Sequence, residues 1–331
     1  MILNIYTWNI LNPQPHISQM SWTCFFKETI NPPKGQRSKG SLNLFEGKAF
    51  APNQSFEIAT IDYERYKLHR IFILIKIIQY WIQVALNDKS PAIICLQEVN
   101  LDLLEKLKTL VNNKQISWSN DTDSNYRVTI VINCKIINSK EIRFDESSIK
   151  CKSILLSNIK IKNKIYQCFN VHLHWSLSIV DLDYVATIIK NNIDESIPFI
   201  IVGDFNKPID LLESFMDPDT LRVCRMASDQ FDCIQFNKQI DSESSYTSML
   251  THIKDSSKPK KGIIDHILLS SDFITDENTK LKIISHIFKY KIFYNFKKII
   301  LLKNLSSQKW INKRKYKDIS DHKPVKLEIS I

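Results

Sequence analysis

Glycine is scarce in this chain, which has only five glycines in 331 residues, and long apolar runs are missing. The most apolar stretch, residues 71–86, contains Lys76, Gln79 and Gln83. It is too short and too polar to span a bilayer, and it predicts a buried helix. The first residues lack a basic lead and a long apolar segment, so no signal peptide is expected. The sequence therefore predicts an intracellular protein, cytoplasmic or nuclear, with no transmembrane segment.

Cysteine is present but shows no pairing pattern. The seven cysteines are odd in number and scattered, and no Cys-x-x-Cys occurs. Several lie in apolar runs, as Cys95 does in AIICLQEV. This pattern is typical of small buried side chains in a reducing compartment, and it argues against a disulfide framework or a zinc site.

Acidic residues are fewer than basic ones. The chain has 45 Lys and Arg against 35 Asp and Glu, which gives a formal net charge of +10. This excess favours a polyanionic partner, such as nucleic acid, an acidic membrane surface or a phosphorylated substrate. A lysine-rich surface that is only solvated explains the charge equally well, so charge alone does not decide the function.

Short segments rich in Ile and Val recur along the chain and predict β-strands, with helical patterns between some of them. The Lys-Asn-Lys at 162–164 predicts a hairpin. Many strands with few helices predict a four-layered α/β sandwich, in which two packed mixed β-sheets are flanked by helices. The expected strands are residues 3–10, 92–99, 127–134, 153–161, 165–173, 199–205, 263–270 and 324–331, and the expected helices are residues 62–86, 100–111 and 181–192.

Residues 12–60 differ from the rest of the chain in composition. They hold three of the five glycines and five of the eleven prolines. Loops of this length are usually functional or disordered. Because no internal repeat and no other change of composition is visible, the sequence predicts a single domain over residues 1–331 with a long loop insertion at about 12–60. Nothing in the sequence indicates an oligomeric state.

Polar residues interrupt the apolar strands near their carboxyl ends. In IIVGDFN, Asp204 and Asn206 follow a buried run, and the strand period of two predicts that both point to the same side. Each such residue taken alone is more often a turn residue, a helix cap or a structural histidine, so the pattern has meaning only as a set. The other members are Asn9, Gln97, Glu98, Asn170, His172, His174, Asp265, His266, Ser320, Asp321 and His322.

These residue types match the needs of metal-assisted phosphodiester hydrolysis. A hard divalent cation such as Mg²⁺ takes oxygen ligands, which Glu98 and Asp321 could supply with Asn9 nearby. Hydrolysis also needs an aligned water, a group that takes its proton and donors for the growing negative charge. Asp204, Asn206 and a pair of histidines provide such groups.

Six segments, in order and in local context, resemble the successive motifs of the endonuclease/exonuclease/phosphatase superfamily: TWN, LQE, NVHL, GDFN, IDHIL and SDHKP. The match runs from Asn9 to Pro324, nearly the whole chain. The superfamily includes DNase I-like nucleases, deadenylases, sphingomyelinases and inositol polyphosphate phosphatases. The resemblance implies a DNase I-like fold and a hydrolase, dependent on Mg²⁺ or Mn²⁺, that cleaves phosphodiester bonds by in-line attack of an activated water.

The resemblance also implies a set of metal ligands. Glu98 matches the main metal carboxylate, with Asn9 beside it and Asp321 completing the shell. The chain departs from the family at the strand 127–134, which lacks the common glycine, and at Lys152, where the family often has arginine. Neither departure lies at a catalytic position, but because of both the sequence does not assign the chain to one subfamily.

The resemblance implies a catalytic role for five further residues. Asp204 would position or deprotonate the attacking water, and Asn206 would donate to the phosphoryl oxygens. His322 would contact the scissile phosphate, with Asp265 orienting its imidazole. His172 matches the position that contacts phosphate or helps the leaving group.

The residues of the motifs resemble most closely those of the deadenylase and nuclease branch of the superfamily, which favours RNA or DNA as substrate. Lysines interleaved with Tyr, Phe and Trp at 254–262, 289–298 and 309–317 suit phosphate contacts with base stacking, although a solvated surface gives the same pattern. His174 is a possible substrate contact, whereas His266 is expected to be structural. The candidate contacts to the nucleic-acid backbone are Lys313, Arg314, Lys315 and Lys317.

Two alternatives remain open at this point. A sphingomyelinase-like lipid phosphodiesterase or a phosphoinositide phosphatase would use the basic residues to bind an anionic membrane surface, although no exposed apolar hairpin is evident. A non-catalytic nucleic-acid-binding module would be expected to have lost part of the catalytic set. The set Glu98, Asp204, Asn206, Asp265 and His322 is intact, which argues against this second alternative.

Overall fold

The computed structural model describes most of the chain between residues 56 and 207 and both ends of the chain. The described ranges are 1–10, 56–119, 125–144, 153–174, 177–207, 264–270 and 324–331, with short pieces at 211–212, 215, 224–226, 248–250, 260–262, 272–273 and 280–283. Two compact units are distinguished, one of residues 1–10, 79–285 and 322–331 and one of residues 11–78 and 286–321. Of the second unit, only the part of helix α3 (Phe56–Asn87) up to residue 78 is described. The single domain therefore stays a prediction.

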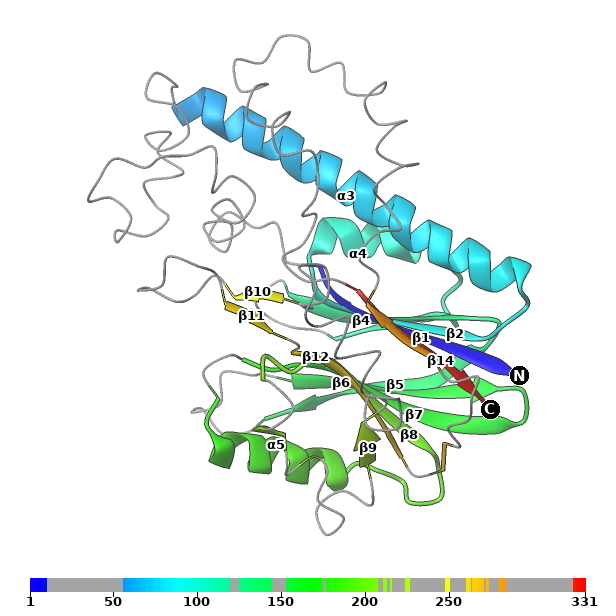
Figure 1. The fold of residues 1–331 in the computed structure, drawn as a ribbon. Helices are drawn as coiled ribbons and strands as arrows, with labels where there is room; N and C mark the ends of the chain where they lie inside the picture. The colour runs from blue at the N-terminus through cyan, green and yellow to red at the C-terminus, as the bar shows by residue number, and fades with distance from the viewer. Residues whose placement is uncertain are drawn as a thin grey trace. The chain divides into compact units, whose positions relative to one another are not determined.

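The first unit contains two six-stranded mixed sheets (Figure 1). The first sheet has the order β13 (Lys280–Ile283), β14 (Val325–Ser330), β1 (Ile2–Asn9), β2 (Ala92–Val99), β4 (Tyr126–Ile132) and β3 (Ile116–Trp118). The second has the order β5 (Lys135–Arg143), β6 (Ser153–Ile161), β7 (Lys164–His172), β8 (Phe199–Asp204), β12 (Asp265–Ser270) and β9 (Cys224–Met226). A separate pair joins β10 (Ser248–Leu250) to β11 (Lys260–Gly262).

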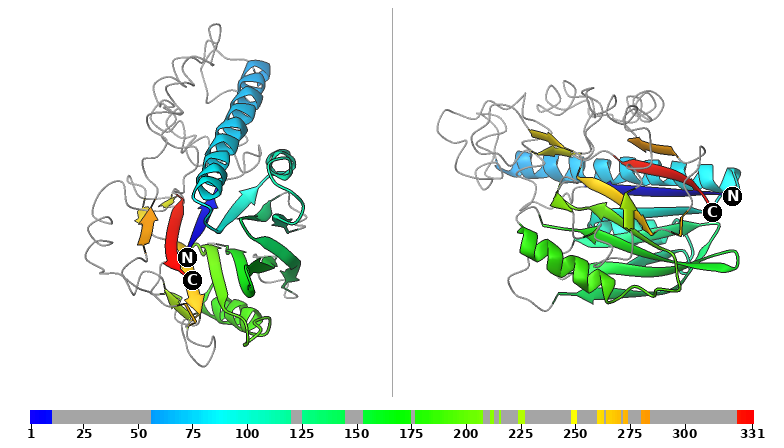
Figure 2. Two further views of the ribbon diagram at one scale, coloured as in Figure 1. Left: turned by 90° about the vertical axis from the view of Figure 1, so that its right-hand side faces the viewer. Right: turned by 60° about the horizontal axis from the view of Figure 1, so that its bottom comes forward.

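Each large sheet has one parallel pair at its centre, β1 with β2 and β7 with β8, and its other pairs are antiparallel. A parallel pair needs a crossover, and the chain supplies α3 between β1 and β2 and helix α5 (Ile179–Lys190) between β7 and β8. The first and last strands, β1 and β14, lie side by side in the first sheet (Figure 2).

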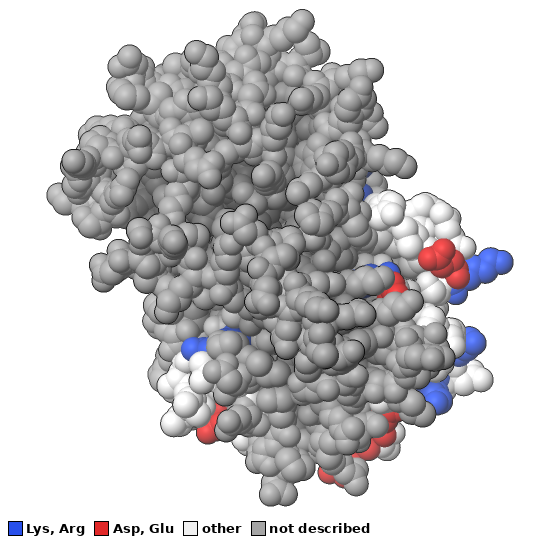
Figure 3. All heavy atoms as spheres, viewed as in Figure 1, with Lys and Arg blue, Asp and Glu red and all other residues white. Residues whose placement is uncertain are grey.

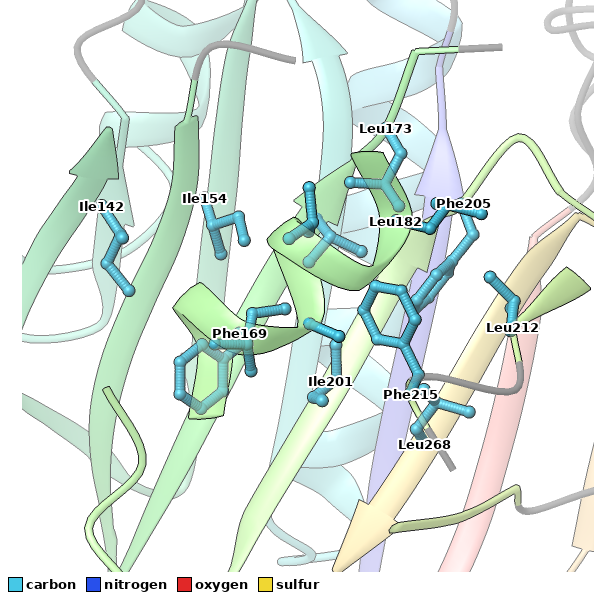
Figure 4. Packing of buried hydrophobic residues seen from close by; sticks show 14 of the residues in the cluster. Ile142, Ile154, Phe169, Leu173, Leu182, Ile201, Phe205, Leu212, Phe215 and Leu268 are labelled. Atoms are coloured by element: carbon cyan, nitrogen blue, oxygen red, sulfur yellow. The ribbon is translucent and has the colours of Figure 1, made fainter. Parts of the chain in front are cut away.

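Helices cover the outer faces of the two sheets. Trp81 of α3 stacks on Tyr6 of β1 with ring centroids 4.9 Å apart, and helix α4 (Leu101–Lys108) contacts β4. On the other side, α5 packs Leu182 and its apolar neighbours against Phe169 and other side chains of the second sheet (Figure 4). The four-layered sandwich predicted from the sequence is therefore confirmed. No described helix is long and apolar enough to cross a membrane.

The inner faces of the two sheets form one apolar core. Ile93 and Cys95 of β2 meet Cys168 of β7 and Ile200 of β8 there. The thiols of Cys95 and Cys168 are free and buried, with their sulfur atoms 3.7 Å apart. The pKa of Cys168 is raised by its hydrogen bond with Cys95 and by burial, which disfavours the thiolate. These two cysteines are small buried side chains, as the sequence predicts.

The predicted strands and helices are all present, with small shifts of their ends. The predicted hairpin is confirmed, since β6 ends at Ile161, β7 begins at Lys164 and Lys162 between them has a φ of 53°. Helix α3 begins at Phe56, so the predicted loop was too long at its end by residues 56–60, where no proline or glycine stops a helix. The rest of that loop lies outside the described residues.

The sequence did not predict the edge strand β5 or the short strands β3, β9, β10, β11 and β13. Most β5 side chains are exposed, and the strand carries Lys135, Lys140, Glu141 and Arg143. Charged residues protect a sheet edge from pairing with another chain, so such a strand lacks the apolar run that reveals a buried one. The others are three or four residues long, which is too short to show a period.

Gly203 allows β8 to approach β7 where the catalytic candidates lie. Its φ is 147°, and a Cβ added there would lie 2.0 Å from the carbonyl oxygen of Val171. We expect Gly203→Ala to lower the unfolding free energy by at least about 2 kcal/mol, because a left-handed backbone is strained for alanine and the new atom meets backbone. Denaturant unfolding measures this. The control Ile200→Val on the same strand should cost about 1 kcal/mol, and equal costs for the two would contradict the geometry.

Candidate active site

The carboxyl ends of the two parallel pairs bring four predicted site residues to one rim of the sandwich. Asn9 ends β1, Glu98 lies near the end of β2, His172 ends β7 and Asp204 ends β8. Hydrogen bonds join the two sheets at this rim. Asn9 Nδ2 donates to Glu98 Oε1 at 3.0 Å and to Asp204 Oδ2 at 2.8 Å. One amide therefore links a carboxylate of the first sheet to a carboxylate of the second.

Glu98 reaches the site because the strand is irregular there. The alternation of β2 directs Cys95 and Gln97 toward the second sheet, so a regular strand would turn Glu98 away from it. Instead Glu98 has a φ of 56°, and the pairing of β2 with β4 shifts register between Leu96 and Val99. Such a bulge re-aims a side chain, and strained backbone of this kind clusters at functional sites. The Glu98 side chain is 14 % exposed, so its carboxylate reaches solvent.

Asp204 and Asn206 are adjacent as predicted, but the predicted reason is wrong. Strand β8 ends at Asp204, and Asn206 lies beyond it with a left-handed φ of 52°. The Asn206 backbone N–H donates to Asp204 Oδ1 at 2.8 Å, and its Nδ2 donates to Asp204 Oδ2 at 3.1 Å and to Leu173 O at 2.8 Å. A turn closed by the aspartate side chain, and not the strand period, brings the pair together.

His172 and Asp265 complete the described part of the site. His172 Nε2 lies 3.4 Å from Glu98 Oε1 and 3.7 Å from Asp204 Oδ2. Asp265 begins β12 directly opposite Asp204 in the antiparallel register, and it is only 2 % exposed. Opposed residues of neighbouring strands share a face, so Asp265 adds a third carboxylate to the rim. Buried carboxylates are stable only when donors, cations or metal ions compensate them.

The donor atoms at the rim fit a hard divalent cation. Carboxylate and amide oxygens are the ligands that Mg²⁺ takes in proteins, and Glu98 and Asn9 offer both kinds. Within the described ranges, no group of three or more His, Cys, Asp or Glu side chains is arranged to hold an ion. The remaining predicted ligand, Asp321, lies outside the described residues, as do His322, Lys313, Arg314, Lys315 and Lys317.

The two other histidines named in the sequence analysis, His174 and His266, differ in their surroundings. His174 is in the segment after β7, where its carbonyl oxygen accepts a hydrogen bond from Leu177 N at 3.2 Å, and a substrate contact there stays a prediction. His266 is buried on the outer side of β12, with Nε2 2.9 Å from Lys207 O and its ring edge against Phe205. Burial lowers the pKa of His266 to about 4, so it is neutral at pH 7, which suits a structural residue.

The buried His266 makes stability depend on pH. Its pKa falls from 6.5 in the unfolded chain to about 4 in the folded chain, so the unfolded state binds the extra proton as the pH falls from 6.5 to 4. We expect this one group to cost about 3 kcal/mol of unfolding free energy across that window. In His266→Gln, which keeps an N–H donor but does not titrate, the loss between pH 7 and pH 4 should be smaller by that amount. Parallel pH profiles for the two proteins would contradict the assignment.

Arg127 is a site neighbour that the sequence analysis did not identify. It lies on β4, is 4 % exposed and donates from Nη1 to Ser153 Oγ at 3.0 Å. Its Nη2 contacts the carbonyl oxygen of His172 at 3.4 Å. The available signal was an arginine at the start of an otherwise apolar strand, since a buried charge in such a place needs a reason.

Comparisons with known proteins agree with this geometry. The model of the Endonuclease/Exonuclease/phosphatase family matches residues 69–322. The fold is similar to that of truncated TDP2 from Caenorhabditis elegans, with 12% identity, a TM-score of 0.53 and coverage of 100% of this chain and 98% of that one. No curated protein sequence matches the chain significantly.

Two further solved structures, a sugar phosphatase and a protein bound to DNA, share the fold. The mannosyl-6-phosphatase of Bacteroides thetaiotaomicron is 12% identical with a TM-score of 0.53, and the match covers 99% of this chain and 100% of that one. TDP2 of D. rerio, complexed with a single-strand DNA product, is 12% identical with a TM-score of 0.52, and the match covers 100% of this chain and 99% of that one. At these identities the likeness establishes the fold alone.

Proposed function

Because the chain belongs to the endonuclease/exonuclease/phosphatase family, whose members hydrolyse phosphoester bonds, we propose that it is a divalent-metal-dependent phosphodiesterase that cleaves nucleic acid. The observation that carries this proposal is the junction at the rim, where one amide of Asn9 joins Glu98 of the first sheet to Asp204 of the second, with His172 against both carboxylates. A binding module without catalysis has no need for this junction.

Hydrogen bonds fix the orientation of the Asp204 carboxylate, as is needed for a group that positions an attacking water. Asn9 Nδ2, Asn206 N and Asn206 Nδ2 all donate to its two oxygens, and the side chain is fully buried. Donors to a carboxylate fix its orientation and stabilise its charge. A carboxylate with one orientation can align an attacking water and accept its proton as the water attacks phosphorus.

In this arrangement Asn206 hydrogen-bonds to Asp204 and orients its carboxylate. Its two Nδ2 hydrogens are used by Leu173 O and Asp204 Oδ2, so a bond to a phosphoryl oxygen would require one of them to be released. His172 has Nε2 between the two carboxylates and can donate from that atom to a phosphoryl or leaving-group oxygen at the rim. Asp265 lies opposite Asp204 in the sheet and would orient a second imidazole, for which His322 is the candidate.

The cation would be held by Glu98 and Asn9, together with Asp321. Glu98 suits this task because its carboxylate is partly exposed, whereas Asp204 is fully enclosed. When bound, a divalent cation neutralises the charge of the phosphoryl group and stabilises the charge that develops on it during hydrolysis. Metal removal should therefore abolish activity without unfolding the chain.

Nucleic acid is the substrate class that the charge favours. The net charge is +10, and the lysine-rich segments 289–298 and 309–317 precede the predicted residues Asp321 and His322. In Figure 3, the few described Lys and Arg side chains on this face lie near Asp and Glu side chains. We assign the backbone contacts to the two lysine-rich segments because they precede Asp321 and His322 in the chain. A fold shared with a TDP2 that holds a single-strand DNA product is consistent with this assignment.

A phosphomonoester is the second candidate substrate. The observation that favours it is the fold shared with a mannosyl-6-phosphatase over nearly the full length of both chains. The same rim residues could act on either class, since both reactions attack phosphorus with water.

A substrate panel separates these candidates. We expect the purified protein with Mg²⁺ to cleave at least one of single-stranded RNA, poly(A), single-stranded DNA, plasmid or abasic duplex, with release of shortened strands seen on a gel. Phosphate release from a sugar phosphate without strand cleavage would establish the phosphomonoester candidate instead. Hydrolysis of sphingomyelin alone would establish a lipid phosphodiesterase.

A further inference from the structure

The candidate site is divided between two sheets. Asn9 and Glu98 belong to the first sheet, and His172, Asp204 and Asp265 belong to the second. Apolar side chains hold the sheets together, and apolar contact is not directional. A shift of one sheet against the other would change every distance across the site, so some directional contact near the rim is needed to set the alignment.

A buried amide pair provides such a contact directly beneath the site. Gln97 of β2 and Asn170 of β7 are both fully buried. Gln97 Nε2 donates to Asn170 Oδ1 at 2.8 Å, across the space between the sheets. Asn170 Nδ2 donates in turn to two main-chain carbonyl oxygens of the first sheet, Val128 O at 3.0 Å and Leu96 O at 3.3 Å. One side chain of the second sheet is thereby tied to two strands of the first.

The two amides lie next to residues of the candidate site, so a change in their positions would also move Glu98 and His172. Gln97 immediately precedes Glu98, and Asn170 lies two residues before His172 on the same face of β7. Gln97 Nε2 also donates to Thr7 Oγ1 at 3.2 Å, and the Gln97 carbonyl oxygen accepts from Ile10 N at 3.1 Å, on either side of Asn9. The register shift of β2 that re-aims Glu98 lies between Leu96 and Val99, so it directly adjoins the hydrogen bonds of Gln97.

We propose that Gln97 and Asn170 are positioning residues that align the two halves of the site. The proposal rests on the proposed function. A fully satisfied buried network of this kind fixes one arrangement of its neighbours, because any sliding leaves buried donors without acceptors. Both side chains are fully buried, so we expect neither to touch substrate or cation. Their effect acts through Glu98 and His172, which they hold at hydrogen-bonding separation.

A second bridge between the sheets offers a matched control. Ser117 of β3 and Ser157 of β6 are both buried, with their Oγ atoms 2.7 Å apart. Their strand partners are at the level of Thr129 and Cys168, below the amide pair and away from the rim. Removing this bridge also deletes a buried hydrogen bond between the sheets, but it leaves the amide pair in place.

The test compares Gln97→Met with Ser117→Ala at a temperature well below the melting temperature of both. We expect Gln97→Met to lower kcat by about 10- to 100-fold with a substrate KM near wild type, the scale seen when a supporting group behind a reacting one is lost. We expect Ser117→Ala to keep kcat within about twofold. The substitution should lower stability, but at that temperature the protein stays folded, and the distant site residues keep their arrangement. Equal kcat values in the two variants would overturn the proposal.

A measurement that needs no activity keeps this test separate from the proposed function. In crystal structures of the two variants, the distance from Glu98 Oε1 to His172 Nε2, now 3.4 Å, should change in Gln97→Met and stay the same in Ser117→Ala. An unchanged distance in Gln97→Met overturns the positioning role whatever the enzyme does. A wild-type protein that cleaves no phosphoester, with the distance changed as expected, would instead refute the proposed function and leave the alignment established.

Discussion

Replacing Asp204 by asparagine should lower kcat by about 10²- to 10⁴-fold, the range typical of a lost, positioned acid–base group. The substitution keeps the shape of the side chain but removes an oxygen that can accept a proton. Asp204 accepts hydrogen bonds from Asn9 and Asn206 on both oxygens, so an amide there also turns one acceptor into a donor that faces other donors. Single-turnover and steady-state rates on the cleaved nucleic acid measure the effect.

The loss must be separated from unfolding, since the facing donors will also cost some stability. Circular dichroism and thermal unfolding establish that the variant is folded at the assay temperature. Asp194→Asn is the matched control, because Asp194 is a solvent-exposed carboxylate that accepts from Ser196 N and Ser196 Oγ in the turn before β8. The control should keep kcat within about twofold, as surface changes usually do. A folded Asp204→Asn variant with more than a tenth of the wild-type rate would remove Asp204 from the chemistry.

Replacing Glu98 by glutamine should act on the cation and on the rate together. Glu98 is the partly exposed carboxylate of the rim, held by Asn9 at 3.0 Å and by His172 at 3.4 Å. A neutral amide keeps an oxygen ligand but loses the charge that a divalent cation needs. We expect the Mg²⁺ concentration for half-maximal rate to rise at least about 10-fold, because the ligand has lost its charge. We expect the rate at saturating Mg²⁺ to fall about 100-fold, because a cation without its charged ligand is no longer held in the position where its charge stabilisation is worth several kcal/mol.

The control for this variant is Glu105→Gln on α4, where the carboxylate pairs with Lys108 on the surface. It removes the same charge from the chain but leaves the rim intact, so both the rate and the Mg²⁺ dependence should match wild type. An identical Mg²⁺ titration for Glu98→Gln and wild type would assign the cation to other residues. A change in KM for the nucleic acid alone would make Glu98 a substrate contact.

The fold could be predicted from the sequence to the extent that burial leaves a pattern. The central strands β1, β2, β7 and β8 are buried on both faces over most of their length, and β2 and β8 in particular appear as dense runs of apolar residues. The edge strand β5 has no such run because solvent covers it. The stacking of the two sheets was predicted from the many strands with few helices between them, since no local pattern encodes which faces meet.

The site could be predicted by residue type and order, but not by geometry. Polar residues at strand ends marked Asn9, Glu98, His172 and Asp204, which the structure brings together. The left-handed backbone of Glu98 and Asn206 follows from a bulge and a turn that depend on partners far away in the sequence. The arginine at the start of an apolar strand marked Arg127 as unusual, but its contact with the backbone of His172 depends on a strand that is distant in the sequence.

The most direct test of the central claim is the rate of phosphodiester cleavage by the wild-type protein as metal is removed and returned. Cleavage of the nucleic acid identified in the panel should proceed in Mg²⁺, stop in excess EDTA and recover when Mg²⁺ or Mn²⁺ is restored, because we propose that Glu98 and its neighbours hold a cation that the chemistry needs. Full activity in EDTA, with the protein free of bound metal, would contradict the account.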